Sequence, residues 1–169
     1  CWSPDGEQIC LEVVHAGQVN LATLKVDDPA GSFHMLIDEE HGYNRAPDWS
    51  PDGNFIAFYS YRSGTPQVEV YDLRAETISR VTQEKVRSFR DPTWTPDGKI
   101  ACPAWGSRDS KLWFVDPAHV FETRDSPRPP QAGYTPHYLS APSVAETYVG
   151  TDPDVDPEAW EYRDYSAWD

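Results

Sequence analysis

The pentapeptide Trp49-Ser50-Pro51-Asp52-Gly53 decides the fold of this chain, because it occurs three times in phase. It stands earlier as Trp2-Ser3-Pro4-Asp5-Gly6 and later as Trp94-Thr95-Pro96-Asp97-Gly98. The three tryptophans follow one another at intervals of 47 and 45 residues. One copy would be an ordinary turn, but three copies at this spacing predict a repeat architecture.

The residues that flank the three turns repeat as well. An apolar run follows each turn, then a short polar turn, then a second strand that ends in Asp, and finally a fourth segment with strand character. The middle copy shows these parts as Phe55 to Tyr59, Arg62-Ser63-Gly64, Gln67 to Asp72, and Ile78 to Thr82. In the third copy the fourth segment is expected at Val120 to Thr123. A period near 45 residues with four strands in each repeat predicts an all-β fold of propeller blades.

The repeats divide the chain into four parts. We expect one blade over residues 1–40, which lacks its first strand, and complete blades over 41–85 and 86–130. A degenerate blade is expected over 131–169, where Tyr138-Leu139-Ser140-Ala141-Pro142 replaces the turn sequence. Because the chain opens inside a motif and without Met, we expect a partial propeller, an excerpt of a ring of six to eight blades.

The residue types of the repeated turn have a physical reason. Proline fixes φ near −65°, aspartate bonds to nearby backbone, glycine accepts positive φ, and serine or threonine can cap the turn through its hydroxyl. The tryptophan offers a large apolar face that can pack between neighbouring blades.

Composition excludes several classes of function. The 169 residues carry a net charge of −14, which repels phosphate backbones and anionic lipid, so we expect neither nucleic-acid binding nor membrane insertion. No apolar stretch approaches the length of a membrane span. The three cysteines form no paired framework, and Cys10 and Cys102 lie in apolar runs, where we expect them to be buried.

These repeats resemble the WD40-like (WSPDG, PD40) repeats of TolB-type β-propellers. The resemblance rests on the three turns together with Ile56-Ala57-Phe58, Tyr71-Asp72-Leu73 and Arg80-Val81-Thr82, and it extends from residue 1 to about residue 125. The first blade departs from the pattern by carrying Cys10-Leu11 in place of Ala-Phe. The resemblance implies a six- or seven-bladed ring, a docking surface for a protein or small ligand, and a periplasmic or extracellular setting.

The same resemblance implies where a ligand would bind. In such blades the innermost strand precedes the turn, so residues there lie at the central channel or its mouth. The charged residues at these positions are Arg45, Asp48, Arg90, Asp91 and His137. Converging charges of this kind can hold a ligand, although charges at strand ends also commonly pair with one another.

Enzymatic alternatives remain open. Propellers of similar repeats accompany the hydrolase domain of prolyl-oligopeptidase family serine peptidases, but the sequence holds no G-x-S-x-G elbow. Oligogalacturonate lyases also resemble this repeat family and use histidines to hold a metal, yet only His137 of the five histidines is expected on an inner strand. The acidic run Asp152 to Glu158 lacks the glycine of a calcium loop. We therefore expect a binding module without catalytic residues, metal or cofactor.

Overall fold

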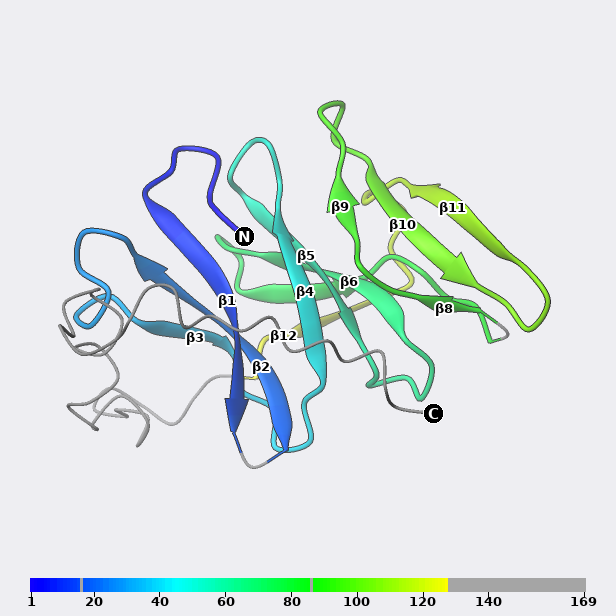
Figure 1. Ribbon diagram of the computed structural model, residues 1–169, viewed down its shortest axis with the longest axis horizontal. Helices are drawn as coiled ribbons and strands as arrows, with labels where there is room; N and C mark the ends of the chain where they lie inside the picture. Colours follow the sequence, from blue (N-terminus) through cyan, green and yellow to red (C-terminus); the bar gives the residue numbers. More distant parts are fainter. Residues whose placement is uncertain (16, 86, 128–169) are drawn as a thin grey trace, which may run out of the picture. The chain divides into compact units, whose positions relative to one another are not determined.

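A computed structural model describes residues 1–15, 17–85 and 87–127, and within them the chain forms twelve β-strands and no helix (Figure 1). The described part therefore offers no apolar helix of membrane-spanning length. The all-β prediction is confirmed for these residues. The predicted degenerate blade and His137 lie outside them, and the blade boundaries at 40, 85 and 130 stay predictions.

The strands form three antiparallel sheets, which follow one another along the chain except that β12 returns to the second sheet. The first sheet has the order β1-β2-β3, and its strands are β1 (Gln8–His15), β2 (Gln18–Lys25) and β3 (His34–Ile37). The second has the order β12-β7-β6-β5-β4, and its strands are β4 (Asn44–Trp49), β5 (Phe55–Ser60), β6 (Gln67–Asp72), β7 (Thr77–Arg80) and β12 (Glu122–Asp125). The third has the order β11-β10-β8 with β9 also on β10, and its strands are β8 (Ser88–Phe89), β9 (Thr93–Trp94), β10 (Ile100–Trp105) and β11 (Ser110–Val115).

The three motif tryptophans occupy the same position in successive sheets. Trp49 pairs with Ile56, Trp94 pairs with Ile100, and Trp2 forms an isolated bridge with Ile9. In every case the tryptophan precedes the turn, and its partner is the first or second residue of the strand that follows. The equivalence predicted from the sequence is confirmed.

The turn itself is closed by bonds among its own residues. In the middle copy the Gly53 N–H donates to the Ser50 carbonyl over 2.9 Å, and Gly53 has a φ of 77°. The Ser50 hydroxyl donates to Asp52 and accepts from the Phe55 N–H at 2.9 Å. The other two copies make the same bonds, so the hydroxyl before proline caps the turn as predicted.

Two apolar cores fill the spaces between neighbouring sheets. The first joins Cys10, Leu21 and Ile37 of the first sheet to Ile56 and Phe58 of the second. The second core joins the other face of the second sheet to the third sheet, and its members are Ala57, Val68, Val70, Val81, Phe89, Ile100, Cys102, Ala104 and Val115. The second sheet is thus packed on both faces, as an internal blade of a stacked array would be.

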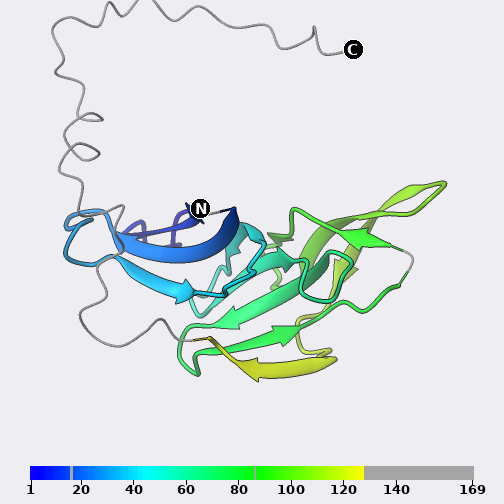
Figure 2. The same ribbon diagram turned by 90° about the horizontal axis from the view of Figure 1, so that it is seen from below.

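A strand forms near the predicted segment 120–123, but it covers Glu122–Asp125 and belongs to another sheet than predicted. β12 pairs with β7 of the second sheet and not with β11 of the third (Figure 2). Charge explains the difference, because Glu122 binds Arg62 at 2.8 Å and Arg80 at 3.2 Å. Arg124 likewise binds Glu39 at 2.8 Å and the buried Glu69 at 3.1 Å. On β11 these four ion pairs would be lost.

Candidate functional site

Two residues with strained backbone lie in β4 and in the link between β8 and β9. Ala46 has a φ of 50° and Asp91 a φ of 46°, although neither residue is glycine. Both residues precede a proline, stand 45 positions apart, and so occupy equivalent places in successive repeats. A left-handed residue costs roughly 1–2 kcal/mol, and such outliers concentrate at functional sites. The neighbourhood of these two residues is therefore the place to look for one.

Glu12 holds the strained segment of β4. One of its carboxylate oxygens accepts from Arg45 Nε at 3.1 Å, and the other accepts from the Ala46 N–H at 2.8 Å. Glu12 lies on β1, so this carboxylate joins the first sheet to the bulge between Arg45 and Asp48. The hydrogen bond that Arg45 donates to Glu12 is the main reason that the pKa of Arg45 is raised.

Tyrosines and arginines gather beside this bulge. The Arg45 guanidinium lies 5.5 Å from the centre of the Tyr43 ring and donates to the Tyr43 hydroxyl at 3.2 Å. The Tyr43 ring meets Tyr61 edge to face at 4.9 Å, and Tyr61 lies 6.1 Å from Tyr59. Arg90 completes the group from the third sheet, with its guanidinium 5.6 Å from the centre of the Tyr61 ring. We name Tyr43, Arg45, Tyr59, Tyr61 and Arg90 the tyrosine–arginine cluster.

The electrostatics of the cluster are mixed. Burial raises the pKa of Tyr59, and the charge of Asp91 adds to the shift while Arg45 and Arg90 oppose it. Arg45 is engaged by Glu12, whereas Arg90 is exposed and forms no ion pair with any residue in the described ranges. The cluster therefore presents aromatic faces and one uncompensated guanidinium to solvent, a combination that is common in protein-binding surfaces.

The structure brings three of the five predicted site residues together, namely Arg45, Arg90 and Asp91. Asp48 instead links two sheets. One of its carboxylate oxygens accepts from the backbone N–H of Trp94 at 2.7 Å, which joins the second sheet to the third. His137 lies outside the described residues. A role in ligand binding remains a prediction for all five.

Sequence reasoning missed the tyrosines and Glu12. Tyr59 and Tyr61 alternate at the end of an apolar run, and this period of two places them on one face of the strand. Tyr43 stands two residues before Arg45 in the same way. Glu12 had no such signal, because it lies 33 residues from Arg45 along the chain.

Metal binding has no site among the described residues, and two of the three cysteines are buried. No three His, Cys, Asp or Glu side chains in that part of the chain lie close enough to hold a metal ion. Cys10 and Cys102 are buried, as predicted, and burial raises the pKa of each thiol to about 12. Such thiols are poor nucleophiles at neutral pH.

The similarity to a known protein family covers the region of the three repeated turns. The family model described as "TolB beta propeller domain" (PD40) matches residues 1–113. The Tol-Pal system protein TolB of Francisella tularensis subsp. mediasiatica is 31% identical over an alignment of 95 residues, and the match covers 47% of this chain and 22% of that protein. A TolB homolog of Chlorobium luteolum is 31% identical over 87 residues, or 52% of this chain and 19% of the relative. The match therefore spans about a fifth of the length of these curated relatives.

Solved structures show the same fold. A protein of Agrobacterium tumefaciens provisionally assigned as TolB is similar over 72% of this chain and 46% of its own, with 25% identity and a TM-score of 0.59. TolB of Acinetobacter baumannii matches 71% of this chain and 30% of its own, with 24% identity and a TM-score of 0.61. An acylaminoacyl peptidase matches 72% of this chain and 24% of its own at 19% identity and a TM-score of 0.51, a likeness of fold alone.

Proposed function

Because this chain belongs to the TolB beta propeller family, we propose that it is a non-catalytic docking module that binds a partner protein through the tyrosine–arginine cluster. The observation that carries the proposal is the cluster itself, in which Arg45 and Arg90 stand next to the strained residues Ala46 and Asp91. Tyr and Arg are among the residues that dominate binding energy at protein interfaces. The proposed setting is periplasmic.

The first partner to test is Pal, since the names of the curated relatives place those proteins in the Tol-Pal system. The exposed Arg90 guanidinium would meet a carboxylate or carbonyl of the partner, while Tyr43 and Tyr61 would supply apolar contact. The peptidase alternative has no observation of its own among the described residues, because the peptidase neighbour shares only the fold.

Purified full-length chain should be titrated with purified Pal by isothermal calorimetry. We expect Tyr61→Ala and Arg90→Ala each to weaken binding about tenfold or more, as hot-spot truncations do. The matched control is Arg108→Ala, an exposed arginine in the loop between β10 and β11, which should leave the affinity unchanged. Absence of Pal binding, or equal affinity for all three variants, would overturn the proposal.

A further inference from the structure

β11 is the outermost strand of the third sheet, and one of its edges is bare within the described ranges. It pairs with β10 on its other side only. Leu112 is 61% exposed and Phe114 is 62% exposed, whereas every residue of the corresponding strand β6 from Gln67 to Tyr71 is buried. A long strand with apolar residues and unpaired backbone groups is a template for another strand.

In the second sheet, β6 has the position that β11 has in the third sheet, and β6 is paired along both of its edges. Ala57 pairs with Val70 in β5–β6, and Ala101 pairs with Phe114 in β10–β11 at the equivalent place. In β6 the next residue on that face, Val68, accepts from the Val81 N–H at 3.0 Å and donates to the Thr82 hydroxyl at 2.8 Å. Leu112 is the counterpart of Val68, so its N–H and carbonyl face the bare edge of β11.

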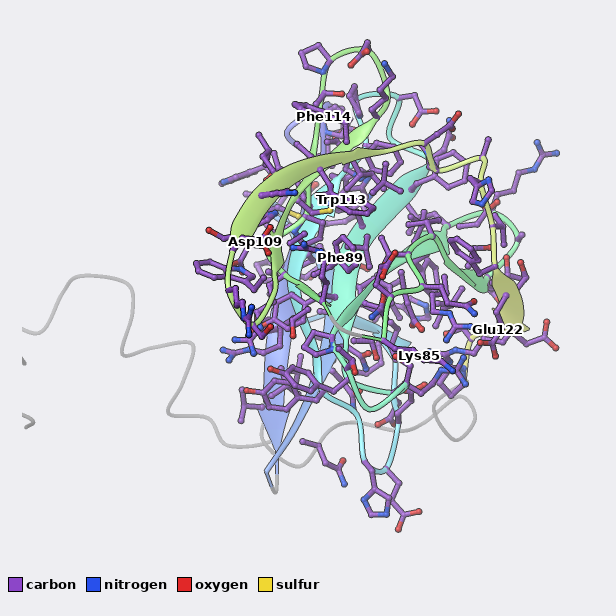
Figure 3. All side chains as sticks on the ribbon, turned by 90° about the vertical axis from the view of Figure 1, so that its right-hand side faces the viewer. Lys85, Phe89, Asp109, Trp113, Phe114 and Glu122 are labelled. Atoms are coloured by element: carbon purple, nitrogen blue, oxygen red, sulfur yellow. The ribbon has the colours of Figure 1, made fainter. Side chains whose placement is uncertain are left out.

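A cavity of about 370 Å³ adjoins this edge. Its apolar wall is formed by Val81, Phe89, Trp113, Phe114, Val115 and Phe121. Figure 3 shows Phe89 and Trp113 side by side, and their ring centres are 5.3 Å apart. In the second sheet the equivalent position is filled by Ile78 of β7, which lies opposite Tyr71 and is 1% exposed. A strand on β11 would therefore insert an apolar residue opposite Val115.

Charge argues against the chain's own β12 as that strand. The acceptor of Arg124 in β6 is Glu69, but Trp113 stands at that position in β11, so the ion pair has no counterpart there. The polar wall of the cavity includes Glu84 and Asp116, and these carboxylates would repel Glu122. The same two carboxylates favour an occupant that places a basic residue near its apolar one.

We propose that the bare edge of β11 binds an extended segment of a partner protein as an added antiparallel strand. The segment carries an apolar, preferably β-branched, residue that fills the cavity opposite Val115, with a basic residue close to Glu84 and Asp116. Main-chain bonds to Leu112 provide affinity and the cavity provides selectivity, as in other cases of strand addition. This surface lies on the last strand of its sheet, and the proposal does not depend on the tyrosine–arginine cluster of the first strands.

The chain supplies its own probe peptide. The segment 75–82, Ala-Glu-Thr-Ile-Ser-Arg-Val-Thr, contains β7, which pairs with β6 in the second sheet, and it carries the required isoleucine and arginine. Titration of isotope-labelled full chain with this peptide should shift the amide signals of Ser110–Val115. Replacing the isoleucine of the peptide by Asp should weaken binding at least tenfold, because a carboxylate would then enter an apolar cavity between two acids.

Two protein variants separate edge pairing from simple apolar contact. Leu112→Pro removes the N–H that faces the bare edge and should abolish binding, while Leu112→Ala keeps that N–H and should retain most of it. The peptide controls keep the test valid if Leu112→Pro fails to fold. Absence of binding, shifts confined to β7 and β12, or binding that ignores both the isoleucine and Leu112→Pro would each overturn the proposal. Slow amide exchange of β11 in the free chain would also overturn it, since a second copy or the chain itself would then cover the edge.

Discussion

At the scale of single residues, one hydroxyl makes two of the hydrogen bonds that close the repeated turn. Ser50 is 2% exposed, and its hydroxyl links the Asp52 carboxylate to the Phe55 N–H. That bond from Ser50 is the first cause of a lowered pKa of Asp52. A carboxyl whose pKa is lowered by folding contributes stability above its unfolded pKa, near 3.8, and loses it as the pH falls through the folded value.

We expect Ser50→Ala to destabilise the chain by about 1–2 kcal/mol, since it leaves the Phe55 N–H without its acceptor. The variant should also lose less stability than the parent on acidification below pH 4, because the pKa of Asp52 returns toward its ordinary value. Urea unfolding at pH 7 and pH 3 measures both effects. Ser107→Ala, at an exposed serine, should change neither, and an unaltered acid profile in Ser50→Ala would contradict the interpretation.

At the scale of elements, β12 shows how charge selects a partner strand. Glu69 is almost fully buried on β6, and burial raises its pKa even though Arg124 and Arg62 lie close to it. Folding therefore strengthens proton binding at Glu69, so its contribution to stability falls as the pH rises from its ordinary pKa through the folded one. Arg124 offsets this cost at neutral pH with a contact of 3.1 Å.

Arg124→Met should destabilise the chain by about 3 kcal/mol near pH 7, because it strips a buried carboxylate of its nearest cation. The loss should shrink as the pH falls toward 5, since a protonated Glu69 no longer needs that partner. Adding Glu69→Leu to Arg124→Met should restore most of the stability. Chemical denaturation at pH 5 and pH 8 distinguishes these cases, with Arg108→Met as the control for loss of an exposed arginine. Equal losses at both pH values would contradict the assignment.

At the scale of the whole described array, apolar cores and separate polar links join neighbouring sheets. Besides the two apolar cores, Asp48 bonds to the Trp94 N–H between the second and third sheets, and Asn20 accepts from Asn44 at 3.1 Å between the first and second. In such a stacked array, stability depends on neighbouring interfaces, so loss of one link should affect one boundary.

Asp48→Ala should therefore loosen the third sheet selectively. We expect hydrogen exchange of the amides in β10 to accelerate about tenfold, corresponding to loss of one charge-assisted bond, while exchange in β2 stays unchanged. Asp27→Ala, at an exposed loop residue, is the matched control. Uniform acceleration across all three sheets would show that the array unfolds as one unit and would contradict the expectation.

The repeated turns were predictable from the sequence, because the bonds that close them join residues no more than five positions apart. The serine or threonine, the aspartate and the glycine of each copy close the turn wherever it stands. The family resemblance follows from the same local chemistry.

Only the tertiary structure decided the place of β12 and the make-up of the tyrosine–arginine cluster. Arg124 reaches Glu69 across 55 residues of sequence, and Glu12 reaches Arg45 across 33. Such contacts depend on which side chains are buried and on which opposite charge is nearest in space. Neither can be read from a short stretch of sequence. The sequence thus determined which strands form, and the packing of charged side chains determined where the last of them binds.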